Sequence, residues 1–70
     1  MRAAMKLVIN GEIKSVPASA TIRELIENLE LKPDRIAVEL NRCIIKRRDW
    51  DRTPVMEADR IEIVQFVGGG

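Results

Sequence analysis

The chain has 70 residues, and its 12 Lys and Arg nearly balance its 11 Asp and Glu. This balance gives no electrostatic reason to expect nucleic acid or an anionic membrane as a partner. A length of 70 residues fits one domain, and a hydrophobic share of 46% is that of a globular protein. No apolar run approaches the roughly 18 residues of a membrane span. With one cysteine and nothing that resembles a signal peptide, we expect a soluble cytoplasmic protein.

The N-terminal third of the chain predicts a β-hairpin. Residues 5–10 alternate as in a strand with one buried face, through Met5, Leu7 and Ile9. The dipeptide Asn10-Gly11 is typical of a type I′ turn, because both central residues of that turn need positive φ. The returning strand is expected over residues 12–16. Its apolar residues Ile13 and Val16 are three apart rather than two, so we expect a bulge or an early end there.

The next segment predicts one amphipathic helix over about residues 21–29. Thr21 and Glu24 form a T-x-x-E capping box, in which each side chain accepts a hydrogen bond from a backbone N–H group of the first turn. Apolar residues then recur at i, i+3, i+4 and i+7, which places them on one stripe of the helix: Ile22, Leu25, Ile26 and Leu29.

Residues 36–40 and 43–46 predict a second pair of strands, joined by a turn at Asn41-Arg42. The first of these strands alternates strictly, with three apolar residues facing the core: Ile36, Val38 and Leu40. Residues 47–54 are polar and irregular apart from Trp50, which we expect to close one end of the core.

The last strand is predicted over residues 60–67, with Ile61 and Ile63 facing the core. Alternation then sends Val64 and Phe66 outward. Exposed apolar patches tend to mark interaction sites, so we favour a docking role for this end of the strand. The alternative is that strand twist tucks Phe66 under the helix. The predicted partner-binding residues are Val64, Phe66 and Val67.

This order of elements predicts an α+β domain of two layers, in which one helix packs on a mixed sheet of about five strands. We expect the domain to occupy residues 1–67, of which residues 1–4 belong to no clear element. Residues 68–70 are Gly-Gly-Gly, which we expect to form a flexible tail.

The sequence offers little equipment for catalysis. It has no histidine and no tyrosine, so the commonest general base and any histidine-based metal cluster are absent. Cys43 is a possible nucleophile, but free cysteine commonly behaves as a small hydrophobe, so we expect a buried strand residue. Asp49 and Asp51 fit a solvated ion-pair cluster with neighbouring arginines better than a pair of catalytic carboxylates. Lys46-Arg47-Arg48 lacks interleaved aromatic residues and favours a solvated loop over a phosphate site.

The glycine end allows two interpretations. One is a frayed end or a cloning remnant. The other is functional: a chain without Cβ atoms can thread a narrow slot in a partner and present its terminal carboxylate to chemistry inside. A carboxylate is a poor electrophile and needs activation, for example as an acyl-adenylate. The functional interpretation makes Gly70 the site of covalent modification and assigns threading to Gly68, Gly69 and Gly70.

Element order, length and the glycine end together resemble the ubiquitin-like sulfur carriers of the β-grasp fold. The ThiS family of thiamin biosynthesis is the most similar, over residues 5–70. The most specific part is residues 59–70, DRIEIVQFVGGG; Val38-Glu39-Leu40-Asn41 and Arg47 with Trp50 are weaker similarities. Two positions depart from the family pattern: Lys46 stands where many members have proline, and Ala58 where the turn usually has glycine.

The resemblance implies a carrier rather than an enzyme, with no bound cofactor. A ThiF-like adenylating enzyme would bring ATP and metal and adenylate the Gly70 carboxylate. A persulfide sulfur donor would then displace AMP, and the resulting thiocarboxylate would pass its sulfur to thiazole synthase. The resemblance also implies that the first and last strands are central neighbours, paired in parallel. The open alternatives are the small subunit of molybdopterin synthase, a plain β-grasp interaction module and, as the weakest, a free-standing enzyme.

Overall fold

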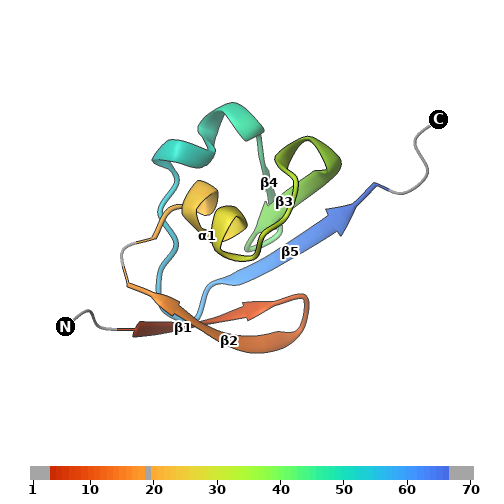
Figure 1. Ribbon diagram of the computed structural model, residues 1–70. Coiled ribbons are helices and arrows are strands. Elements are labelled where there is room, and N and C mark those ends of the chain that lie inside the picture. Colours follow the sequence, from red (N-terminus) through yellow and green to blue (C-terminus); the bar gives the residue numbers. More distant parts are fainter. Residues whose placement is uncertain (1–3, 19, 67–70) are drawn as a thin grey trace.

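The computed structural model describes residues 4–18 and 20–66, and in this part of the chain one α-helix packs against one sheet (Figure 1). The strands are β1 (Ala4–Ile9), β2 (Glu12–Pro17), β3 (Ile36–Leu40), β4 (Cys43–Ile45) and β5 (Arg60–Gln65). The helices are α1 (Ile22–Asn28) and the 3-10 helices η1 (Pro33–Arg35) and η2 (Arg47–Arg52). The predicted α+β arrangement of two layers is confirmed.

The sheet has the strand order β2-β1-β5-β3-β4, so the first and last strands are central neighbours. β1 and β5 pair in parallel, whereas the other three neighbouring pairs are antiparallel. Parallel neighbours need a long crossover connection, which here includes α1 and the β3–β4 hairpin. Figure 1 shows β5 running through the middle of the sheet, between β1 and β3. The predicted pairing is therefore confirmed.

The β1–β2 hairpin is regular. Its pairing runs without interruption from Ala4 with Pro17 to Ile9 with Glu12, so the predicted bulge in β2 is wrong. The three-residue spacing has a simpler cause: Val16 is buried against the core, whereas Ile13 is 73% exposed on the opposite face. The predicted turn is confirmed, because Asn10 and Gly11 have φ values of 50° and 82°.

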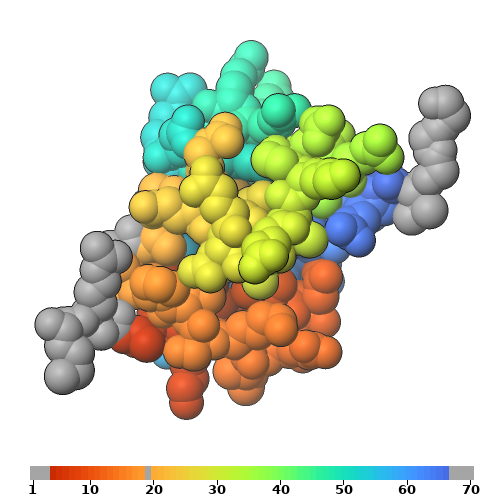
Figure 2. Space-filling model, viewed as in Figure 1, coloured from red at the N-terminus to blue at the C-terminus, as the bar shows by residue number. Residues whose placement is uncertain are grey.

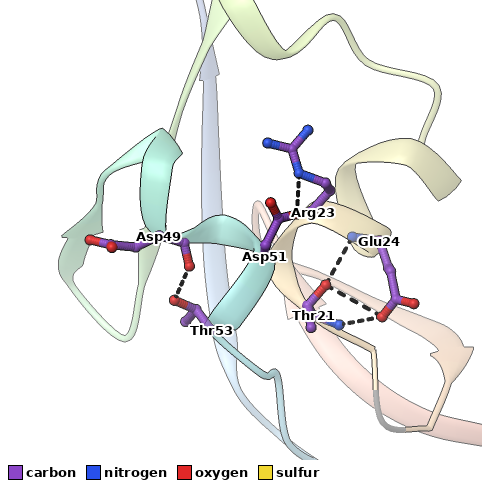
Figure 3. A network of polar contacts seen from close by, with 6 residues as sticks. All are labelled: Thr21, Arg23, Glu24, Asp49, Asp51 and Thr53. Carbon is purple, nitrogen blue, oxygen red and sulfur yellow. Dashed lines mark hydrogen bonds and ion pairs between the residues drawn. The ribbon is translucent and has the colours of Figure 1, made fainter.

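Helix α1 begins as the sequence predicts. Both halves of the capping box are formed (Figure 3): the Thr21 backbone N–H donates to Glu24 Oε1 at 2.9 Å, and the Glu24 backbone N–H donates to Thr21 Oγ1 at 3.2 Å. The predicted stripe faces the core, with Ile22, Leu25 and Ile26 buried. Figure 2 shows this helix-covered side, with α1 lying between η2 and the β1–β2 hairpin.

Residues 47–54 were predicted to be irregular, but residues 47–52 form the 3-10 helix η2, which packs against α1. Trp50 is 1% exposed, and its Nε1 donates to the Ile45 carbonyl oxygen at 3.0 Å, which confirms that it closes the core. The two aspartates bind different cations: Asp49 pairs with Arg52 at 2.7 Å, and Asp51 pairs with Arg23 of α1. Figure 3 shows Asp51 facing Arg23. The ion-pair interpretation is confirmed, although one cation comes from the helix.

The core lies between α1 and the sheet and is almost wholly aliphatic. In the part of the chain that the structure describes, every buried side chain is hydrophobic. The buried residues are Met5, Leu7, Ile9, Val16, Ala20, Ile22, Leu25, Ile26, Ile36, Val38, Trp50, Val55, Ile61 and Ile63. β5 contributes Ile61 and Ile63 to this core from the centre of the sheet, so the strand that leads to the C-terminal residues is anchored in the core.

Candidate functional site

β5 is hydrogen-bonded to β3 along most of its length and to β1 only at its beginning. On one side it pairs with β3 from Leu40 with Ile61 to Ile36 with Gln65. On the other, the Asp59 carbonyl oxygen accepts from the Val8 N–H at 3.0 Å. The strand ends at Gln65, two residues before the predicted end.

Two asparagines in equivalent turns also bind this strand. Asn10 and Asn41 both have a φ of 50°, and each occupies the first central position of a hairpin turn. The Asn10 side chain hydrogen-bonds both backbone polar groups of Ile63, through Oδ1 at 2.8 Å and Nδ2 at 3.2 Å. Asn41 Oδ1 accepts from the Arg60 backbone N–H at 2.9 Å, and its Nδ2 donates to Asp59 Oδ1 at 3.1 Å. Each side chain therefore holds a different end of β5.

Two of the predicted partner-binding residues lie at the exposed end of β5. Val64 is 54% exposed, and Phe66 is 58% exposed. The backbone N–H of Phe66 donates to the Arg35 carbonyl oxygen at 2.8 Å, so the backbone is held while the side chain faces outward. The alternative in which Phe66 is tucked under the helix is therefore wrong. Val67, Gly68, Gly69 and Gly70 lie outside the described residues, and their roles stay predictions.

The sheet face opposite α1 carries further exposed apolar residues. Ile13 on β2 and Ile44 on β4 are each 73% exposed.

Cys43 is also exposed, so the prediction of a buried cysteine is wrong. The reason is its place: it is the first residue of an edge strand of three residues and directly follows the turn.

Two carboxylates interrupt this apolar face. Glu39 pairs directly opposite Glu62 across β3 and β5, and Glu39 also pairs opposite Ile44 across β3 and β4. Like charges in directly opposite positions destabilise a sheet. Among the described residues, neither glutamate forms an ion pair. The opposed pair therefore adds no stability through an ion pair of its own.

A model of the ThiS family matches residues 7–70, a range that takes in the whole of β5 and the three terminal glycines.

The chain belongs to the ThiS family.

Individual relatives agree with this ThiS assignment. The sulfur carrier protein ThiS of Bacillus subtilis is 35% identical over 65 residues, which are 91% of this chain and 98% of that protein. A crystal structure of the thiamine biosynthesis protein ThiS from Geobacter metallireducens has 33% identity and a TM-score of 0.83, and the match covers 94% of this chain and all of that one. The fold is thus the ubiquitin-like β-grasp of ThiS proteins.

A longer relative matches as well. The thiazole synthase of Paramagnetospirillum magneticum is 41% identical over 66 residues, which are 94% of this chain but 20% of that protein. The chain therefore spans about a fifth of the length of the thiazole synthase that it matches.

One departure from the ThiS pattern has a visible conformational consequence. Ala58 has a φ of 71°, in the left-handed region that glycine adopts without a steric penalty. Its backbone N–H donates to the Lys6 carbonyl oxygen at 2.7 Å, which ties this turn to β1. Glycine at this position would adopt the same conformation without that steric penalty.

Neither a metal-binding cluster nor a membrane-spanning helix is found in the described part. Over residues 4–18 and 20–66, no three side chains of His, Cys, Asp or Glu gather in a group able to hold a metal ion. Across the same ranges, none of the helices has the length and apolar character needed to cross a membrane.

Proposed function

We propose that this chain is a sulfur carrier of thiamin biosynthesis, with Gly70 as the residue that carries the sulfur. The observation that supports this most strongly is the match to the ThiS family over residues 7–70, since that range includes the glycine end. The central position of β5 adds a physical reason. A strand that begins between two neighbours, contributes to the core and is paired with β3 as far as Gln65 gives the residues that follow it a fixed starting point.

The chemistry acts on the terminal carboxylate. An oxygen of the Gly70 carboxylate attacks the α-phosphorus of ATP, pyrophosphate leaves, and a mixed anhydride with AMP forms. The terminal sulfur of a persulfide then attacks the carbonyl carbon and AMP leaves. This attack forms a carbon–sulfur bond and leaves an acyl disulfide. A thiol then attacks the donor's sulfur and breaks the sulfur–sulfur bond that came from the persulfide, so that a disulfide leaves and the carrier keeps a thiocarboxylate. A ThiF-like adenylating enzyme supplies ATP, metal and the acid–base groups for these steps.

The exposed end of β5 provides the docking surface for that enzyme. We assign docking to Val64, Phe66 and Val67; the first two are more than half exposed in the free chain. The carboxylates of Glu39 and Glu62, on the same face as Val64, select a partner surface that carries a cationic side chain. Docking would then relieve the repulsion between the two glutamates and bury the apolar side chains.

Thiazole synthase is the proposed acceptor of the sulfur. The Paramagnetospirillum magneticum thiazole synthase contains a segment similar to this chain, so a carrier-like segment shares one polypeptide with the rest of that protein. This linkage supports transfer between the two partners.

The identity of the sulfur acceptor is tested by measuring sulfur transfer to each candidate enzyme. The carrier is prepared with a C-terminal thiocarboxylate and offered separately to thiazole synthase and to the large subunit of molybdopterin synthase. Turnover with thiazole synthase alone is expected. Turnover with the molybdopterin enzyme alone would assign the carrier to that pathway, and turnover with neither would favour an interaction module.

A further inference from the structure

β1 stops supporting β5 before β5 ends. The last paired residues of the two strands are Ile9 and Ile61, because the chain turns away into β2 at Asn10-Gly11. β5 continues for four more residues, to Gln65. Every second residue of β5 directs its backbone N–H and C=O groups toward β1. Ile61 is one of these residues, and its carbonyl oxygen accepts a hydrogen bond from the Asn10 N–H at 2.9 Å. The next residue that faces this side is Ile63.

The Asn10 side chain takes the place of the missing β1 residue. Its Oδ1 accepts a hydrogen bond from the Ile63 N–H at 2.8 Å, and its Nδ2 donates to the Ile63 carbonyl oxygen at 3.2 Å. A side-chain amide thus offers one acceptor and one donor, as a backbone residue of a neighbouring strand does. The hydrogen bonding between β1 and β5 therefore continues for one more residue of β5, although the chain has already turned from β1 into β2.

Past Ile63, the described end of β5 is held by β3 and η1 on the other flank. Gln65 pairs with Ile36, and the Phe66 N–H bonds to the Arg35 carbonyl oxygen. We propose that Asn10 is a positioning residue, whose carboxamide fixes the direction in which β5 leaves the sheet. On the proposed function, this direction sets where Gly70 meets the adenylating enzyme.

The chain supplies a matched control in Asn41. It has the same φ of 50° and binds β5 through the same two side-chain atoms, but it does so at Arg60 and Asp59, at the start of the strand. Replacing either asparagine by glycine keeps the positive φ accessible and removes two hydrogen bonds. The two variants should therefore lose similar stability, while only Asn10→Gly loosens the end that leads to the tail.

The first measurement follows the strand end in the free protein. Backbone ¹⁵N order parameters of Gln65 and Phe66 should fall in Asn10→Gly and stay near the wild-type values in Asn41→Gly. Unchanged values in Asn10→Gly would overturn the proposal. Asn10→Asp is the second variant, since it keeps the acceptor for the Ile63 N–H and should give an intermediate fall.

The second measurement is the steady-state rate of adenylation by the ThiF-like enzyme. Because a misplacement of about 1 Å can cost about 100-fold in rate, kcat for Asn10→Gly should fall at least about tenfold. KM for the carrier should change less than kcat, because the docking side chains keep their identity although the strand end that bears them is less ordered. Equal losses of kcat in both glycine variants would show a purely structural role. If the wild type is not adenylated, the proposed function fails, and the order parameters still decide whether Asn10 holds the strand end.

Discussion

Glu39 on β3 lies directly opposite Glu62 on β5, on the sheet face that α1 does not cover. Two like charges in this position repel each other, and neither has a cationic partner within the described residues. On the proposed function, a cation on the adenylating enzyme would face the two glutamates and offset this repulsion.

Glu39→Gln should therefore stabilise the free chain and weaken docking. Removing the repulsion should raise the free energy of unfolding by about 0.2–1 kcal/mol, measured by urea denaturation. Titration calorimetry with the adenylating enzyme should show weaker binding. The control is Glu27→Gln on the exposed side of α1, which should leave binding unchanged. Tighter or equal binding by Glu39→Gln would remove the glutamates from the docking surface.

Phe66→Asp should keep the fold and lose affinity for the adenylating enzyme. The side chain is 58% exposed, so a carboxylate at this position costs little in the free chain. Ile13→Asp is the matched control, because Ile13 is an exposed apolar residue at the far edge of the sheet. Calorimetry should show weaker binding for Phe66→Asp alone. If Ile13→Asp binds equally weakly, the docking surface is wider than the end of β5.

Leu25→Ala should destabilise the chain by about 2–5 kcal/mol, because the substitution leaves a cavity under α1. Leu25 is 1% exposed and lies on the stripe that faces the sheet. Thermal unfolding of the two proteins measures the difference. A loss below about 1 kcal/mol would mean that the helix repacks around the smaller side chain.

Ala58→Gly should stabilise the chain by about 1 kcal/mol, because the left-handed conformation costs a residue with a Cβ roughly that much. Ala37→Gly is the same chemical change inside β3, and there it should destabilise by about 0.5–1 kcal/mol. Opposite shifts of the melting temperature are expected. A fall for both variants would show that Ala58 is not strained in this turn.

Local patterns in the sequence predicted most of the fold. The Thr21–Glu24 capping box and the Asn10-Gly11 turn each act over a few residues, so the sequence shows them directly. Alternation also placed Val64 and Phe66 on the exposed side. The β2 bulge was predicted wrongly because Ile13 was assumed to face the core, although an exposed apolar residue on an uncovered sheet face fits the register better.

Contacts between distant residues could not be predicted in this way. Asn10 binds Ile63, which is 53 positions away in the sequence. The tendency of asparagine to adopt positive φ already explained its presence in the turn, so nothing in the sequence pointed to a second role for its side chain. The partner of Asp51 proved to be Arg23 of α1, because the packing of η2 on the helix brings them together. Cys43 was assigned to the core because free cysteine is commonly buried. Residue type alone does not show that Cys43 lies on an edge strand of three residues, where it is exposed.

The central claim is that Gly70 carries the sulfur, and its competitor within the chain is the exposed thiol of Cys43. The most direct measurement is the intact mass after incubation with the adenylating enzyme, ATP and a persulfide donor, followed by peptide mapping. Three proteins are compared: the wild type, Cys43→Ser and a chain that lacks Gly70. Deleting Gly70 draws the reacting carbonyl back by roughly 3.5 Å.

The wild type and Cys43→Ser should each gain the mass difference between one sulfur and one oxygen, located in the C-terminal peptide. The chain without Gly70 should gain nothing. Sulfur on Cys43, or equal labelling of the wild type and the shortened chain, would contradict the account.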